Sequence, residues 1–118
     1  MPNLARLVKE GVSGPLQSIL PPITPPAWTT FMTGKNPGKH GIFHFIETEP
    51  GGYTMTYANG GSRRTPTLWR MLNDAGLTVG TVNIPFTYPV HQVDGFVISG
   101  FGTPASAYSF ISVRPSSQ

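Results

Sequence analysis

Residues 22–42 read PITPPAWTTFMTGKNPGKHGI and carry the clearest structural signal in the chain. The segment from Pro26 to Met32 predicts a short helix, because a proline is tolerated in the first turn, where its missing N–H is not needed. Gly34 follows the last turn, where a glycine commonly ends a helix. Thr24 is therefore expected just before the helix, near the positive end of its dipole, which is a favourable place for an anion.

The same stretch resembles the nucleophile motif of the type I phosphodiesterase and nucleotide pyrophosphatase family, within the alkaline-phosphatase superfamily. In that family a threonine or serine nucleophile precedes a short helix that closes with Thr-Gly, followed by a proline and then by His-Gly-Ile. The residues that hold the same relative spacing here are Thr24, Thr33, Gly34, Pro37, His40, Gly41 and Ile42. The resemblance continues outside the motif and covers most of the chain.

The resemblance implies a hydrolase that cleaves phosphodiester or pyrophosphate bonds in phosphate-ester or nucleotide substrates. Thr24 would be the catalytic nucleophile and would form a phospho-enzyme. Family members use two divalent metal ions, usually zinc, held by Asp and His residues, and the hydroxyl of Thr24 would also be a metal ligand in the complete parent protein. Two such metals polarise the nucleophile and clamp the attacking and leaving oxygens.

Few residues of the sequence are candidate ligands for those metals. It has five acidic residues and three histidines, and none of them stands in a recognisable ligand pattern. In the family the first metal aspartate lies on a strand before the opening helix, and the other ligands follow further downstream. We therefore expect residues 1–118 to be a partial catalytic domain, without its first strand and the downstream metal-ligand region, and we expect no tight metal binding by this fragment.

Several single residues have both a structural and a functional interpretation. His40 occupies a position that mainly supports the loop in the family, so a hydrogen-bonded structural histidine is favoured over a metal ligand. Nucleotide pyrophosphatases of the family place an asparagine three residues after the nucleophile to bind a phosphoryl oxygen, and Ala27 stands there instead. His44 and His91 are interpreted as surface or loop residues. The aromatic residues at helical positions, which we interpret as core, are Trp28, Phe31 and Trp69.

The rest of the chain alternates helical and apolar strand-like segments. Helices are expected from Asn3, as the cap, to Gly11, and from Thr67 to Gly76. The expected strand-like runs cover residues 16–20, 42–46, 77–84 and 96–100, and the polar stretch 47–64 is expected on the surface. This alternation predicts an α/β fold with a largely parallel sheet. The resemblance implies a partial alkaline-phosphatase-like three-layer sandwich.

Composition argues against several classes of partner. Eight basic and five acidic residues give a net charge of +3, the basic residues form no dense cluster, and no nucleic-acid-binding motif is present. The absence of cysteine removes disulfides and thiolate metal sites. No apolar run approaches the roughly 20 residues of a membrane helix. Residues 1–4 lack a signal-peptide pattern, which favours a cytoplasmic location but leaves the compartment open.

Two other interpretations stay open. The parent could belong to another branch of the superfamily, such as a sulfatase or a phosphomutase, because the metal framework is shared and Ala27 departs from the nucleotide pyrophosphatase pattern. The chain could also be a non-catalytic truncated module that keeps the α/β packing without a complete active site.

Overall fold

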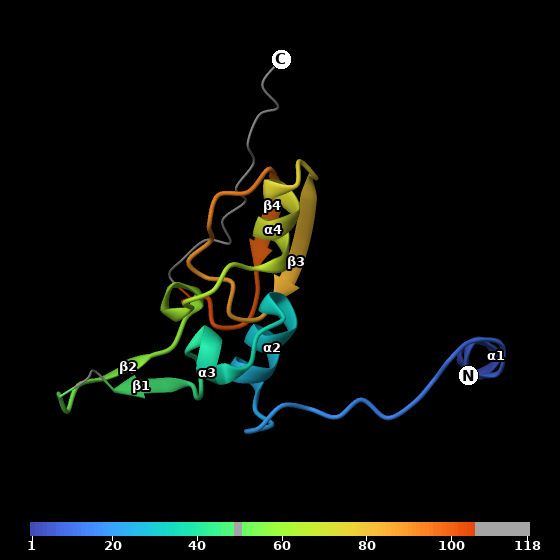
Figure 1. The fold of residues 1–118 in the computed structure, drawn as a ribbon, viewed down its shortest axis with the longest axis horizontal. Helices are drawn as coiled ribbons and strands as arrows, with labels where there is room; N and C mark the ends of the chain where they lie inside the picture. Colours follow the sequence, from blue (N-terminus) through green and yellow to red (C-terminus); the bar gives the residue numbers. More distant parts are fainter. Residues whose placement is uncertain (49–50, 106–118) are drawn as a thin grey trace, which may run out of the picture.

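The computed structural model describes residues 1–48 and 51–105 (Figure 1). The helices are α1 (Pro2–Glu10), α2 (Thr24–Thr33), α3 (Pro37–His40) and α4 (Leu68–Asp74), with a 3-10 turn, η1 (Gly60–Ser62). The strands are β1 (Ile46–Thr48), β2 (Met55–Tyr57), β3 (Val79–Ile84) and β4 (Gly95–Ser99). None of the helices in the described ranges has the length and apolar character needed to span a bilayer.

The strands form two separate pairs. β3 and β4 pair in parallel from Val79 opposite Gly95 to Ile84 opposite Ser99, with a bulge near the end. Gly95 is required at this pairing, because its φ is +124° and a Cβ there would lie 1.8 Å from the carbonyl oxygen of Val79. β1 and β2 form an antiparallel pair that projects from the rest of the molecule (Figure 1). The expected α/β fold with parallel pairing is confirmed, as part of an alkaline-phosphatase-like architecture.

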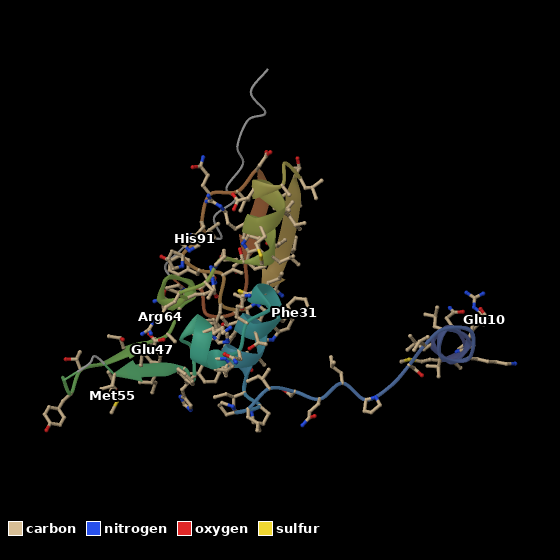
Figure 2. All side chains as sticks on the ribbon, in the orientation of Figure 1. Glu10, Phe31, Glu47, Met55, Arg64 and His91 are labelled. Carbon is tan, nitrogen blue, oxygen red and sulfur yellow. The ribbon has the colours of Figure 1, made fainter. Side chains whose placement is uncertain are left out.

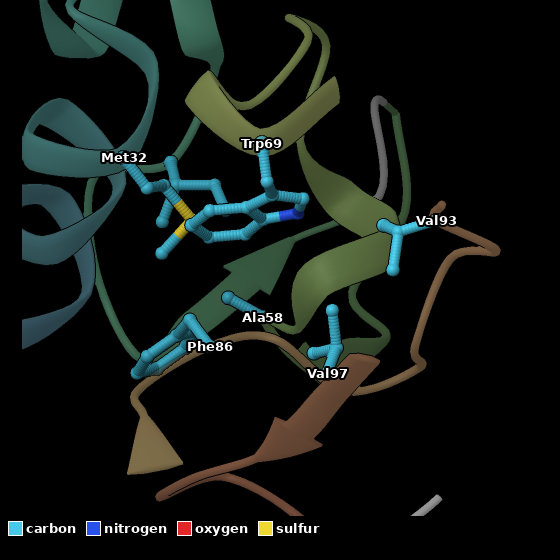
Figure 3. Packing of buried hydrophobic residues seen from close by; sticks show 7 residues of the cluster. Met32, Ala58, Trp69, Phe86, Val93 and Val97 are labelled. Carbon is cyan, nitrogen blue, oxygen red and sulfur yellow. The ribbon is translucent and has the colours of Figure 1, made fainter. Parts of the chain in front are cut away.

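One apolar core joins α2 and α4 to the parallel strands. Trp69 of α4 lies between Met32 of α2 and Val93, which precedes β4 (Figure 3). The other buried apolar members are Ile42, Ala58, Phe86 and Val97. Because Met32 belongs to this core, the C-terminal half of α2 is fixed against α4 and the sheet.

The N-terminal segment differs from the expectation. α1 is present, but Met1 is its cap position, Pro2 is its first residue and no side chain caps it, so the predicted Asn3 cap is wrong. Every residue of α1 is exposed, and the helix lies apart from the core at the end of an extended stretch (Figure 1). The strand expected over residues 16–20 is absent, because a strand needs a hydrogen-bonded neighbour and this stretch pairs with none of the described residues.

The middle of the chain also corrects two expectations. The strand expected over residues 42–46 begins only at Ile46, because Ile42 is buried in the core and its N–H bonds to the ring of His40. The polar stretch that follows is mostly exposed, as expected, but Ala58 and Gly60 are buried. The N–H of Gly60 donates to the carbonyl of Tyr88 at 2.6 Å, which ties this stretch to the segment between β3 and β4.

Candidate active site at the start of α2

Thr24 is the first residue of α2, two positions earlier than the expected start of the helix. Ile23 occupies the cap position with extended backbone angles of −120° and 159°, and its side chain has no oxygen with which to cap the helix. Pro25 and Pro26 follow at the next two helical positions, and both are buried. Their fixed φ is compatible with the first turn, so the helix can include both prolines and begin at Thr24.

The two prolines remove most of the hydrogen-bond donors that a helix start normally exposes. An α-helix leaves about four N–H groups free at its N-terminus. Here the N–H of Ile23 donates to the carbonyl of Pro21 at 2.9 Å, and Pro25 and Pro26 have no N–H. Ala27 already donates to Ile23 at 3.1 Å. Only the N–H of Thr24 therefore remains for an anion at this helix start, so the favourable place expected there offers one donor.

The hydroxyl of Thr24 is distinct from the other threonine hydroxyls of α2. Thr29 donates to the carbonyl of Pro25 at 2.7 Å, and Thr33 donates to the carbonyl of Thr29 at 2.6 Å. Thr30 bonds to the ring of His40 at 3.0 Å. Among the described residues, the half-buried Thr24 makes no side-chain hydrogen bond. It is thus the one hydroxyl of α2 left available to an external group within the part of the chain that the structure describes.

His40 joins α3 to the middle of α2. It is fully buried, its Nδ1 accepts from the N–H of Ile42 at 3.2 Å, and its Nε2 lies 3.0 Å from Oγ1 of Thr30. Because Nδ1 accepts, the neutral ring carries its proton on Nε2 and donates it to Thr30. Burial lowers the pKa of His40, the charge of Arg63 lowers it further, and the carbonyl of Pro26 opposes both. His40 is therefore a neutral, hydrogen-bonded structural residue, as the sequence favoured.

Comparison with known proteins gives one positive result. The sequence profile of the type I phosphodiesterase / nucleotide pyrophosphatase family matches residues 1–116. The chain belongs to this family. No curated protein and no solved structure matches the chain. The family membership makes the chain part of a group of hydrolases of the alkaline-phosphatase superfamily that act on phosphate-ester or nucleotide substrates.

Family members are generally metal-dependent, but the described residues do not fit a metal site. Within residues 1–48 and 51–105, no three His, Asp or Glu side chains lie together. His44 and Glu47 line a cavity of about 430 Å³ beside β1, whereas His91 lines a different one. Glu49, the remaining acid of that segment, lies outside the described residues. The side chains that the structure describes thus do not by themselves form the two-metal centre that the resemblance implies for the complete parent protein.

The aromatic residues of this phosphodiesterase-family chain are not all in the core. Trp69 is 7% exposed, but Trp28 and Phe31 are 39% and 67% exposed, so the expectation holds only for Trp69. Trp28 and Phe31 meet edge to face at 5.5 Å, and Phe31 points outward from α2 (Figure 2). Together with Ala27 they line an apolar hollow of about 220 Å³. Ala27 contributes to this apolar surface and has no side-chain donor for a phosphoryl oxygen.

Proposed function

We propose that Thr24 is the nucleophile of a hydrolase that cleaves phosphodiester or pyrophosphate bonds. The observation that carries the proposal is the free Thr24 hydroxyl at the start of α2, where every other threonine hydroxyl of the helix is engaged. A hydroxyl that is already hydrogen-bonded to the backbone must break that bond before it attacks, and Thr24 has no such bond to lose. The family membership supports the same class of reaction.

The proposed reaction has two steps. Oγ1 of Thr24 attacks the phosphorus, the bond to the leaving oxygen breaks, and the hydroxyl proton passes to solvent while the leaving oxygen becomes an alcohol or a phosphate. Water then attacks the phosphoryl group on Thr24, which restores the threonine and releases the second product. Covalent catalysis of this kind divides one difficult displacement into two easier ones.

The residues around Thr24 can contribute to this reaction in a limited way. The α2 dipole favours a negative charge at its N-terminus by about 0.3–1 kcal/mol, and the N–H of Thr24 adds one donor. The prolines and Ala27 supply no further donor. Activation of the Thr24 hydroxyl therefore needs groups outside the described residues. In this proposal the chain forms part of a catalytic domain, and no reaction step is assigned to a metal bound by the described residues.

The test measures both turnover and the covalent intermediate. The full chain is incubated with bis-p-nitrophenyl phosphate, with zinc or manganese added, and p-nitrophenolate release is followed beside mass spectrometry of the peptide that contains Thr24. We expect Thr24→Ser to keep the adduct and Thr24→Ala to lose it, with turnover reduced at least about 100-fold, because the nucleophile is removed. Thr54→Ala, at an exposed threonine, is the matched control and keeps wild-type turnover.

Two results would contradict the proposal. One is turnover by Thr24→Ala equal to that of the wild type. The other is a phosphoryl adduct on a different residue in the wild-type chain. Absence of turnover in the wild type as well as in the variant would fit both a partial catalytic domain, whose activating groups lie outside the described residues, and the non-catalytic module.

A second candidate is a sulfatase-like or phosphomutase-like branch of the same superfamily. Ala27 favours it, because this position lacks the asparagine with which nucleotide pyrophosphatases bind a phosphoryl oxygen. Parallel assays with p-nitrophenyl sulfate separate the two candidates. Faster turnover of the sulfate ester than of the phosphodiester would replace the phosphodiesterase assignment, while Thr24→Ala would still test the nucleophile.

A further inference from the structure

A cationic cavity lies away from the start of α2, between residues 63–70 and residues 91–93. Its volume is about 300 Å³, and the side chains that give it its chemical character are Arg63, Thr65, Arg70 and His91. We refer to this cavity as the Arg63 pocket. No aspartate or glutamate of the described residues lines it. A cavity of this size, with several polar groups that converge on it, is typical of a site for a small ligand.

The charge of Arg63 is not balanced by any described residue. The only ion pair in residues 1–48 and 51–105 joins Arg70 to Asp74 at 2.9 Å. Arg63 instead donates from Nη1 to the thioether sulfur of Met32 at 3.4 Å, which is a weak acceptor. Burial lowers the pKa of Arg63, because the charged guanidinium loses water, yet an arginine side chain stays charged at neutral pH. A half-buried cation of this kind is stabilised by an anion.

Thr65 provides a second and independent indication. Its hydroxyl oxygen is buried and has no hydrogen-bond partner among the described residues. A buried polar atom without a partner costs about 1–3 kcal/mol and calls for a water, an ion, a ligand or another explanation. Thr81 and Ser99 also have such hydroxyls, but of the three only Thr65 lines the Arg63 pocket. The backbone N–H of Arg70 donates to Thr67, so the hydroxyl of the neighbouring threonine is already engaged. Thr65 also lines the Arg63 pocket, but protein atoms cover its unpaired hydroxyl oxygen, so the side chain has to rotate before the hydroxyl reaches a ligand there.

We propose that the Arg63 pocket binds a phosphate-type oxyanion. The planar guanidinium of Arg63 can offer two parallel N–H groups to two phosphate oxygens. Such a bidentate, charge-assisted pair is stronger than a hydrogen bond between neutral groups. After rotation of its side chain, the hydroxyl of Thr65 donates to a third oxygen. Arg70 and His91 are exposed and stand at the mouth of the pocket, where Arg70 adds positive charge that Asp74 partly neutralises.

The bound group is distinct from the one that would react at Thr24. Arg63 contacts Met32, which lies about two helical turns after Thr24, roughly 12 Å further along α2 at ~1.5 Å per residue. We therefore treat the group in the Arg63 pocket as separate from the one that would react at Thr24. The ligand is therefore either free inorganic phosphate or a further phosphate group carried by an ester, and both present the same oxyanion to Arg63.

The experiment is isothermal titration calorimetry of the full chain with inorganic phosphate and, separately, with phenyl phosphate, at constant ionic strength. We expect Arg63→Gln to weaken binding at least about tenfold, because a charge-assisted hydrogen bond is lost, and Thr65→Val to weaken it by a smaller factor. Arg64→Gln is the matched control. Arg64 is adjacent, exposed and beside Glu47 at the other cavity (Figure 2), so its loss is expected to leave binding within about twofold.

The outcomes separate specific binding from general charge attraction. Equal weakening by Arg63→Gln and Arg64→Gln, unchanged binding by Arg63→Gln, or no heat with either ligand would each overturn the proposal. Binding of phenyl phosphate alone supports it and assigns the source to a phosphate ester, whereas binding of both supports a site for the bare oxyanion. If circular dichroism shows that Arg63→Gln is unfolded, the nearly isosteric Thr65→Val decides. Thr24→Ala is expected to bind phosphate with the affinity of the wild type. Failure of the Arg63 pocket proposal is therefore distinguishable from failure of the nucleophile proposal.

Discussion

Helices α2 and α4 both begin beside a threonine and a proline, but the hydroxyl of one threonine is hydrogen-bonded and that of the other is not. Thr67 caps α4, is 3% exposed, and accepts a hydrogen bond from the N–H of Arg70. Thr24 lies one position further into its helix, and its hydroxyl makes no hydrogen bond with the described residues. The same residue type therefore stabilises the backbone in one helix and remains available for chemistry in the other.

The difference originates in the prolines. In α4 the single proline, Pro66, precedes the cap, and the N–H three residues after the cap remains to bond Thr67. In α2 the positions that a cap would serve are Pro25 and Pro26, which have no N–H. α2 loses the stabilisation of a cap and is held instead at its middle, where His40 bonds to Thr30. The Thr24 hydroxyl can therefore stay free because the His40–Thr30 hydrogen bond, which we call the anchor of α2, holds the helix at its middle.

Removal of this anchor has the largest expected effect. His40→Ala leaves a cavity at a fully buried site and takes the partner from both the Ile42 N–H and the Thr30 hydroxyl. We expect a loss of about 2–4 kcal/mol in the free energy of unfolding, measured by urea denaturation followed by circular dichroism. His44→Ala, at an exposed histidine, is the control and should change it by less than ~0.5 kcal/mol. Equal losses in the two variants would show that α2 has no special anchor.

Exchange of the two threonines tests the comparison directly. Thr67→Ala removes a helix cap and is expected to lower the free energy of unfolding by about 1 kcal/mol, whereas Thr67→Ser keeps it. Thr24→Ala removes a hydroxyl without a partner and should cost less than ~0.5 kcal/mol. The same urea denaturation applies to all three. A larger loss from Thr24→Ala than from Thr67→Ala would mean that the Thr24 hydroxyl has a structural role, which would weaken the case for a nucleophile.

Local signals in the sequence predicted where α2 ends and where α4 begins. Gly34 ends α2 with φ +64°, and Thr67 caps α4, because each device acts on its immediate neighbours. The loss of donors at Pro25 and Pro26 was also visible in the sequence, since proline has no N–H in any fold. It was missed because the helix was expected to start after Thr24 rather than with it.

Apart from the Asn3 cap and the exact start of α2, the incorrect predictions concern properties that depend on distant residues. Leu16 and Leu20 have strand-like neighbours, but no partner strand reaches them within the described residues. Arg63 and Arg64 look equivalent in sequence, yet one is half-buried against Met32 and the other is exposed. Whether a cation has a carboxylate partner is decided by segments far apart along the chain. The Arg63 pocket could therefore not be predicted from residue order.

Acid titration has the smallest expected effect and tests the same anchor of α2. Burial holds the pKa of His40 below the 6.5 of a free histidine, so the unfolded chain binds a proton more readily than the folded one. Stability is therefore fully present above pH 6.5 and falls as the pH drops from 6.5 through the folded-state pKa. Urea midpoints between pH 7.5 and pH 5 should decline in the wild type and in Thr67→Ala, but decline less in His40→Gln, which has no ring to protonate. If His40→Gln keeps the full decline, the acid-sensitive group is elsewhere, and protonation of His40 would not be what loosens α2 at low pH.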